Sequence, residues 1–314
     1  MSGVLDAESR ELLEVFARDG VRPYDQMSVL QARAVVAGAT RLQGPREHVE
    51  QVSDVLIDLG PGRMSARLYH PDPAGVLPLV VYLHGGGFVA GSVAVADRPC
   101  RALAIAAGCA VLSVEYRLAP ENPFPVPIFD CLTAIRWVVD HASQHGLDAS
   151  RVVVMGDSAG GALAASCALA LRDAGDSPLI GQVLLYPTLR PTRGNPSASL
   201  QTNGEGYSMT RGSLEWFWEH YLAGSADGVN PLAAPLLARD FDGLPPTTVI
   251  VAEFDPLRDE GLDYARRLHD GGVPTRVHLI PGGLHGLWWM DKVLGQAREL
   301  TGYLAADLRL RFGQ

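Results

Sequence analysis

The chain carries, at residues 151–165, the stretch RVVVMGDSAGGALAA. Its apolar first third predicts a buried strand, and its alanine-rich last third predicts a helix. Ser158 is therefore expected on a sharp turn between the two, where a strained backbone lifts the hydroxyl clear at the top of a sheet. Gly156 and Gly160 fit this geometry because a Cβ on either side would collide with the strand or the helix. The pattern is that of a nucleophile elbow, G-x-S-x-G.

A second motif precedes the elbow. The apolar run Leu79–Leu83 predicts a buried strand that leads into the loop His84-Gly85-Gly86-Gly87-Phe88. Three consecutive glycines let the backbone approach a ligand closely and point N–H groups inward, as in HGGG-type loops that donate to an oxyanion. His84 is predicted to be structural and to brace this loop, because the elbow pattern orders its triad along the chain as Ser, acid and His.

That order restricts the general base to the four histidines after Ser158. We expect His220 and His269 on helices, partly exposed, and His278 on one face of a strand. His285 follows that strand on a glycine turn, at the carboxyl edge of the sheet where α/β proteins bind ligands. His285 is therefore the predicted base.

The acid should follow the preceding strand, which the apolar run Thr247–Ala252 predicts. Asp255 lies on the exit of this strand and is held by a following proline, so it is the predicted acid. Glu253 and Asp259 are the rivals. Asp259 fits better in the first turn of the next helix, where an anion complements the helix dipole.

Together these motifs resemble those of the hormone-sensitive lipase family of microbial carboxylesterases, also called family IV. Order and spacing agree across residues 50–310, and Asp157 in the elbow resembles the GDSAG branch. The motifs that carry the resemblance are His84-Gly85-Gly86-Gly87, Tyr116-Arg117-Leu118-Ala119-Pro120-Glu121, Gly156-Asp157-Ser158-Ala159-Gly160-Gly161, Asp255-Pro256-Leu257-Arg258-Asp259-Glu260-Gly261 and His285-Gly286.

The resemblance implies an α/β-hydrolase fold, a mostly parallel twisted sheet flanked by helices with a helical cap. It also implies a triad of Ser158, Asp255 and His285 that needs no cofactor and no metal. The oxyanion donors that it implies are backbone N–H groups, and Gly85 and Asp157 join His84 as structural motif positions. The implied oxyanion residues are Gly86, Gly87 and Ala159.

The chain divides by composition into four parts. Residues 1–48 have helical apolar spacing and are predicted to begin a cap, and 49–187 alternate strands and helices as a catalytic core. Residues 188–228, rich in helix interrupters and then aromatic, are assigned to the rest of the cap, and 229–314 complete the core. A hairpin is predicted around Pro61-Gly62, with further strands at 110–114 and 183–186.

The walls of the substrate pocket are predicted less directly. Trp216 and Phe217 lie in an aromatic helical stretch that either packs the cap on the core or faces the cleft. Phe88 beside the oxyanion loop and Leu284 beside His285 are placed for the pocket. We assign all four to it as candidates.

Composition indicates which classes of binding partner and which cellular location to expect. A net charge of −9 over 314 residues argues against a nucleic-acid partner and favours a soluble protein. The four cysteines have no metal-binding spacing and are expected to be reduced and buried. The acidic N-terminus has no secretory signal and no run could span a membrane, which predicts a cytoplasmic protein.

The predicted function is a carboxylesterase for short-to-medium acyl or aryl esters, acting on small-molecule substrates. A lipase, a lactonase or an amidase would use the same triad. A non-catalytic small-ligand receptor on this fold is the alternative of a different class, disfavoured because all three triad residues are present. The family resemblance further suggests a homodimer through the last core strand, Arg276–Ile280.

Overall fold

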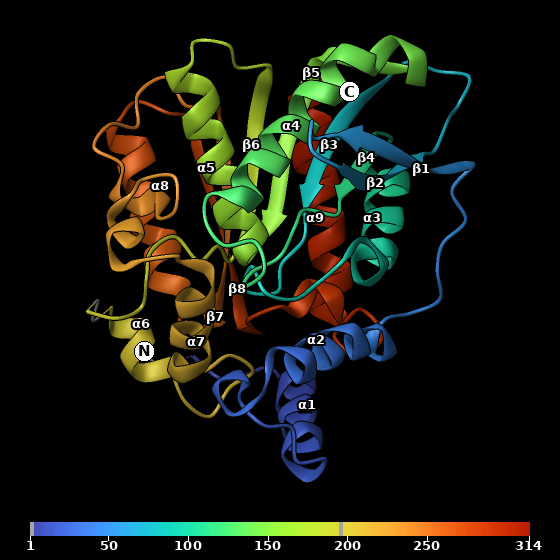
Figure 1. The fold of residues 1–314 in the computed structure, drawn as a ribbon. Helices are drawn as coiled ribbons and strands as arrows, with labels where there is room; N and C mark the ends of the chain where they lie inside the picture. Colours follow the sequence, from blue (N-terminus) through green and yellow to red (C-terminus); the bar gives the residue numbers. More distant parts are fainter. Residues whose placement is uncertain (1–2, 195–196) are drawn as a thin grey trace.

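A single eight-stranded sheet organises the chain (Figure 1), which a computed structural model describes over residues 3–194 and 197–314. The strand order is β1-β2-β4-β3-β5-β6-β7-β8; β1 and β2 run antiparallel to their neighbours and the others are parallel. This confirms the predicted mostly parallel sheet. The strands are β1 (Gln51–Asp58), β2 (Arg63–His70), β3 (Leu77–Leu83), β4 (Ala110–Val114), β5 (Leu147–Asp157), β6 (Leu179–Leu185), β7 (Thr247–Phe254) and β8 (Thr275–Leu284).

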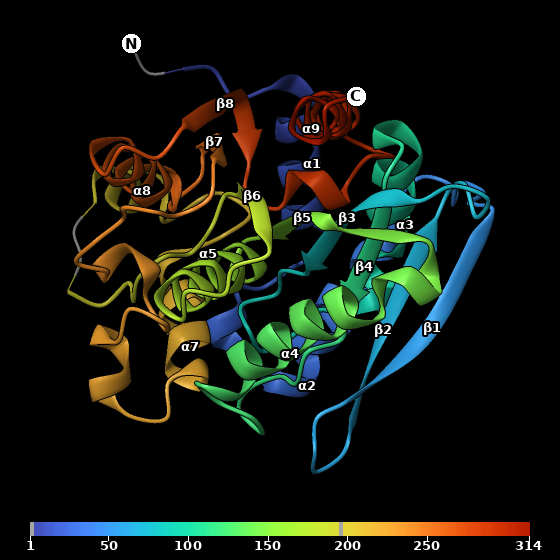
Figure 2. The same cartoon turned by 90° about the horizontal axis from the view of Figure 1, so that it is seen from above.

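Helices cover both faces of this sheet (Figure 2). On one face α3 (Val93–Ala107) and α9 (Gly295–Phe312) pack against strand side chains such as Val80. On the other, α4 (Val126–His141), α5 (Ala159–Asp173) and α8 (Arg258–Asp270) pack against side chains such as Val81. Successive strand residues thus enter opposite cores, and strands buried on both faces read as continuous apolar runs.

Strand positions follow the sequence closely in the core. The predicted hairpin is confirmed, with Val55 opposite Ala66, and β4 has its predicted bounds. The end of β8 differs from the expected glycine turn, because the strand continues to Leu284. Its register shifts so that Leu284 pairs with Phe254, and the glycines of that stretch allow the irregularity.

Two helical segments lie at the carboxyl ends of the parallel strands (Figure 1). The first contains α1 (Ala7–Arg18), η1 (Tyr24–Gln26), α2 (Val29–Gly38) and η2 (Ala39–Leu42), and the second contains α6 (Ala198–Asn203), α7 (Arg211–Tyr221) and η4 (Ser225–Val229). Local capping fixes where the helices start: Ser28 and Gln31 form a capping box at α2, and the Thr210 hydroxyl accepts from the Ser213 amide at α7. The remaining short helices are η3 (Ala142–His145), η5 (Pro235–Leu237) and η6 (Leu287–Trp289).

The cysteines are as expected, since all four are free and buried. Across residues 3–194 and 197–314, no helix combines the length and the apolar character that crossing a bilayer requires.

Candidate active site

Ser158 occupies a strained turn between β5 and α5. Its φ of 53° and ψ of −118° lie where side-chain-bearing residues rarely occur, and its amide donates to the Leu185 carbonyl at 2.8 Å. A Cβ at Gly156 would collide with the carbonyl of Gly160, and one at Gly160 with the carbonyl of Leu83. The two glycines therefore permit the close approach of strand and helix that presents the serine.

The three predicted triad side chains meet at this turn. His285 Nε2 lies 2.9 Å from Ser158 Oγ, and His285 Nδ1 lies 2.8 Å from Asp255 Oδ2. The second Asp255 oxygen accepts from the Leu257 amide at 2.8 Å. A carboxylate beside Nδ1 keeps the ring proton there and leaves Nε2 free to accept from the serine. Asp255 is fully buried, whereas Ser158 is 7% and His285 5% exposed. The serine and the imidazole are therefore the triad members that reach the cavity.

The rival acids have other partners. Glu253 accepts from the Gly282 amide at 2.8 Å and so ties the carboxyl ends of β7 and β8 together. Asp259 lies in the first turn of α8, as expected, and accepts from the Ser199 amide at 2.7 Å. Neither carboxylate is the one that contacts the ring of His285.

The other three histidines that follow Ser158 are not among the residues that line the cavity at the serine. His220 Nδ1 contacts the Trp216 carbonyl at 2.9 Å on α7, His269 lies in the last turn of α8, and His278 stacks on Tyr303 with ring centroids 4.0 Å apart. Each therefore lies on the element that the sequence predicted, a helix for the first two and a strand for the third.

The glycine loop after β3 offers free amide groups beside the serine. Gly86 (φ 118°) and Gly87 (φ 63°) have conformations that side chains rarely adopt, and a Cβ at Gly87 would enter the Phe217 ring. In the described part of the chain, neither glycine N–H donates to a protein acceptor. The Ala159 amide, first in α5, likewise has no acceptor within its helix. Three N–H groups are thus available to a developing anion.

Buried polar groups hold this loop from behind. Asp157 Oδ1 accepts from the Tyr82 hydroxyl at 2.5 Å and from the Gly85 amide at 2.8 Å. His84 Nδ1 contacts the Gly85 carbonyl at 2.9 Å, and its ring stacks on Tyr116 at 4.3 Å between centroids. Burial lowers the pKa of His84, so its ring is neutral inside the protein. Asp157 and His84 therefore both contact the residue that begins the glycine run.

Asp157 makes stability depend on pH. Burial raises its pKa from 3.8 to about 6, against the lowering effect of the Tyr82 hydrogen bond. A carboxyl whose pKa is higher in the folded state binds more protons there, so its contribution to stability falls as pH rises toward and past 6. Asp157→Asn keeps the Oδ1 acceptor but does not titrate, so the variant lacks this pH-dependent loss of stability. We expect the free energy of unfolding of the wild type to fall by about 1–2 kcal/mol relative to the variant between pH 5 and pH 8. Urea unfolding of both proteins at pH 5 and pH 8 measures these free energies. The same difference between wild type and variant at both pH values would contradict the expectation.

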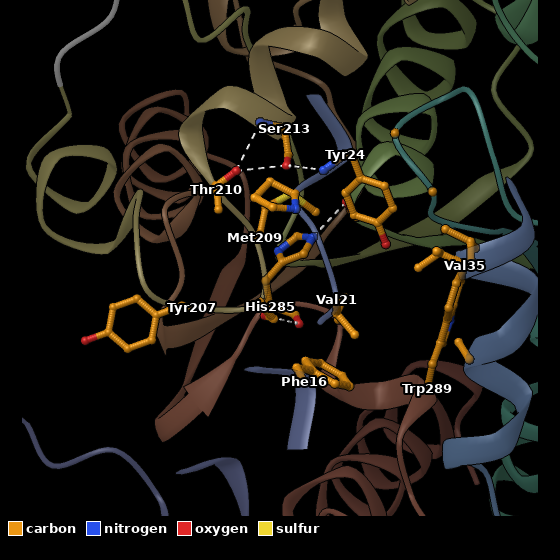
Figure 3. A pocket seen from close by; sticks show the side chains of 18 of the residues that line it. Phe16, Val21, Tyr24, Val35, Tyr207, Met209, Thr210, Ser213, His285 and Trp289 are labelled. Atoms are coloured by element: carbon orange, nitrogen blue, oxygen red, sulfur yellow. Dashed lines mark hydrogen bonds between the residues drawn. The ribbon is translucent and has the colours of Figure 1, made fainter. Parts of the chain in front are cut away.

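A cavity of about 710 Å³ adjoins the serine. Figure 3 shows the side chains that line it, with His285 among them. Ser158, His285, Gly86 and Gly87 line its floor. Aromatic and aliphatic side chains from both helical segments and from η6 form much of its walls; they include Phe16, Val21, Tyr24, Val35, Tyr207, Met209, Phe217, Trp218 and Trp289. A cavity of this size and character suits a small apolar ligand with one polar reacting group.

Two of the four predicted wall residues lie on this cavity and two do not. Phe88 and Phe217 line it. Trp216 is not among the residues that line it; its ring packs on His220 and on Phe217, with ring centroids 4.2 Å and 5.2 Å apart. Leu284 is fully buried in the extended end of β8, so these two assignments are corrected.

Comparison with known proteins agrees with this geometry. A family model described as the α/β-hydrolase fold matches residues 80–289, which is more than half of the chain. The chain belongs to the α/β-hydrolase family. Within this family its relatives confirm the resemblance to the hormone-sensitive lipase group, because they are named as esterases.

Three similar proteins illustrate the relationship within the α/β-hydrolases. The esterase LipI of Mycobacterium tuberculosis is 39% identical over 274 residues, 85% of each chain. An ethyl acetate hydrolase of Pseudomonas putida is 38% identical over 264 residues, 82% of each chain. An ester hydrolase from the metagenome of Lake Arreo, solved with a derivative of bipyridine phosphonate, superimposes with a TM-score of 0.94 at 39% identity and covers 99% of this chain and 100% of its own.

The sequence did not indicate which N-terminal residues of this α/β-hydrolase reach the cavity. Phe16, Val21, Tyr24 and Val35 all line it, although they lie more than a hundred residues from Ser158. One signal was present: Phe16 continues the apolar stripe of α1, which includes the buried Leu12. Such a stripe predicts a buried face but does not identify its partner.

Proposed function

We propose that this chain is a serine carboxylesterase that hydrolyses short-to-medium acyl or aryl esters, with Ser158, His285 and Asp255 as its catalytic triad. The contact chain of 2.9 Å and 2.8 Å from the serine through the imidazole to the buried carboxylate carries the proposal. The relatives named as an esterase, an ethyl acetate hydrolase and an ester hydrolase support the reaction class.

The first half-reaction forms an acyl-enzyme. Ser158 Oγ attacks the ester carbonyl carbon while its proton passes to His285 Nε2, and the Asp255 carboxylate stabilises the imidazolium that forms. The carbonyl oxygen becomes an oxyanion, which accepts hydrogen bonds from the amides of Gly86, Gly87 and Ala159. The intermediate then collapses, and the alcohol leaves with the proton from Nε2.

The second half-reaction releases the acid. A water molecule gives a proton to His285 Nε2 as it attacks the acyl carbon, and the same amides stabilise the second oxyanion. Collapse breaks the bond to Ser158 Oγ, which regains the proton from the imidazolium. The products are a carboxylic acid, an alcohol and the free enzyme, and the triad alone moves every proton.

The form of the cavity supports the substrate range. Aromatic walls such as Phe217 and Trp289 suit aryl or alkyl groups, and the cavity of about 710 Å³ accepts a group of drug-like size. Phe88 belongs to these walls, and its ring stacks on Tyr221 at 3.8 Å between centroids, which fixes its position.

A series of p-nitrophenyl esters from acetate to palmitate tests the proposal. We expect kcat/KM to be highest for short and medium chains and to fall for palmitate. An abrupt gain of activity on emulsified triglyceride would favour the lipase alternative, and preference for lactones or amides would favour those alternatives. Saturable binding of p-nitrophenyl esters without any turnover would favour the receptor alternative.

The arrangement of the chain supports two further proposals. We propose that residues 1–48 and 188–228 together form a cap over a catalytic core of residues 49–187 and 229–314, because both segments wall the cavity. We also propose a homodimer through β8, since this strand is last in the sheet order and exposes Val277 and Leu279. Sedimentation velocity at micromolar concentration tests the dimer, and a monomer alone would reject it.

The location proposed from the sequence is cytoplasmic. Its support in the structure is the set of four free thiols, which is usual in a reducing compartment. Fractionation of expressing cells, followed by an immunoblot, tests it; recovery in the medium would contradict it.

A further inference from the structure

Arg33 joins the N-terminal helix α2 to two loops of the core. Its Nε donates to the Val89 carbonyl at 2.8 Å, and its Nη2 donates to the Ala119 carbonyl at 3.0 Å. The same guanidinium holds the Glu121 carboxylate in a bidentate pair, at 2.8 Å and 2.5 Å. One side chain thus makes charge-assisted contacts to two backbone carbonyls and one acid, which the planar fork of arginine permits and a lysine does not.

Both carbonyl acceptors belong to residues that are tied to the oxyanion loop. The Val89 amide donates to the Gly86 carbonyl at 3.2 Å, and the Ala119 amide donates to the Phe88 carbonyl at 2.9 Å. Arg33 therefore contacts the turn of residues 86–89 at Val89, and the same turn carries the Gly86 and Gly87 amides.

Apolar packing surrounds the two residues whose carbonyls Arg33 contacts. Val89, Ala119 and Phe217 form one buried cluster, against which Tyr24 and Val29 of the N-terminal segment pack. The Phe217 ring also covers the loop at Gly87. The oxyanion loop is thus held between the two helical segments, with Arg33 as its polar attachment to the first of them.

We propose that Arg33 is a positioning residue for the oxyanion hole. It fixes the turn of residues 86–89 through the Val89 and Ala119 carbonyls, so that docking of the N-terminal segment and orientation of the oxyanion donors occur together. The inference rests on the proposed esterase function. It differs from a simple docking role for Arg33, which would affect stability and substrate binding rather than the chemical step.

The kinetic signature follows from this placement. A displaced oxyanion donor weakens an interaction that becomes strong only in the transition state, so kcat falls while KM changes little. A displacement of about 1 Å at a reacting site costs up to about 100-fold. Arg33 acts through the backbone of its neighbours, so we expect a loss in kcat of about 10-fold or more in Arg33→Met, with KM changed less than about threefold.

Steady-state kinetics on p-nitrophenyl butyrate test this, with Tm recorded for each variant. Arg33→Lys, which keeps the charge but not the fork, should recover part of the lost kcat. Glu121→Gln keeps an acceptor for Arg33 and leaves its contacts to both carbonyls, so it should retain wild-type kcat. Arg266→Met is the matched control, because Arg266 pairs with Asp263 and Asp270 on α8, far along the chain from the loop.

The results separate the two roles. An Arg33→Met enzyme with wild-type kcat overturns the inference, whatever its Tm. Equal losses of kcat in Arg33→Met and Glu121→Gln also overturn it, because the acid and not the carbonyl contacts would then matter. If Arg33→Met does not fold, Arg33→Lys decides: reduced kcat at unchanged KM supports the inference, and wild-type kcat overturns it. Absence of turnover in the wild type would instead reject the proposed function itself.

Discussion

Ser158→Ala is expected to fold normally and to lose about 10⁴-fold or more of esterase turnover. The variant keeps the cavity and its amide donors but has no oxygen to attack the ester, so no acyl-enzyme forms. Among the described residues, the hydroxyl has one hydrogen-bond partner, His285 Nε2 at 2.9 Å, so we expect its removal to leave the packing of the elbow unchanged. Initial rates on p-nitrophenyl butyrate and a thermal melt measure the two halves of this expectation.

Ser166→Ala provides the matched control for that experiment. Ser166 is also buried and lies on the same helix, α5, but it does not line the cavity. Its replacement should leave kcat within about twofold of the wild type, since it contacts no reacting group. Substantial hydrolysis by Ser158→Ala, with correct folding, would reject the serine as nucleophile and with it the proposed mechanism.

The reacting groups were predictable from the sequence because each lies in a short motif at the end of a strand. Strand, turn and helix around Ser158 are contiguous in the chain, and the strained turn itself requires Gly156 and Gly160. The carboxyl ends of parallel strands share one edge of the sheet, so Asp255 and His285 could be placed near the serine from their order alone.

The cavity walls were not predictable in the same way, because they form by contacts between distant segments. Tyr24 meets Phe217 with ring centroids 4.9 Å apart, although 193 positions (217 − 24) separate them in the chain. The contact between Arg33 and Val89 similarly depends on how α2 docks on the core. Helical spacing predicts that a face is buried, whereas the partner of that face is set by tertiary packing. Trp216 shows this limit, because the aromatic stretch predicts it for the pocket, whereas in the structure its ring packs on His220 and Phe217 and does not line the cavity.

Asp255→Asn should lower kcat by about 10⁴-fold while the protein remains folded. Asp255 Oδ1 accepts from the Leu257 amide at 2.8 Å, so the asparagine oxygen is expected to keep that place and its NH₂ group to face His285. An amide donor beside Nδ1 favours the ring tautomer that carries its proton on Nε2. That tautomer cannot accept the proton of Ser158, and the serine is no longer activated.

Glu253→Gln is the control that distinguishes the orientation of His285 by Asp255 from a general need for negative charge at the end of β7. Glu253 lies two residues before Asp255 and accepts from the Gly282 amide, a contact that glutamine can keep. Its kcat on p-nitrophenyl butyrate should stay within about threefold of the wild type. If Glu253→Gln lost as much activity as Asp255→Asn, activity would depend on negative charge at the ends of β7 and β8 rather than on one oriented carboxylate. A fully active Asp255→Asn enzyme would remove Asp255 from the triad, because only its orientation of the imidazole places it there.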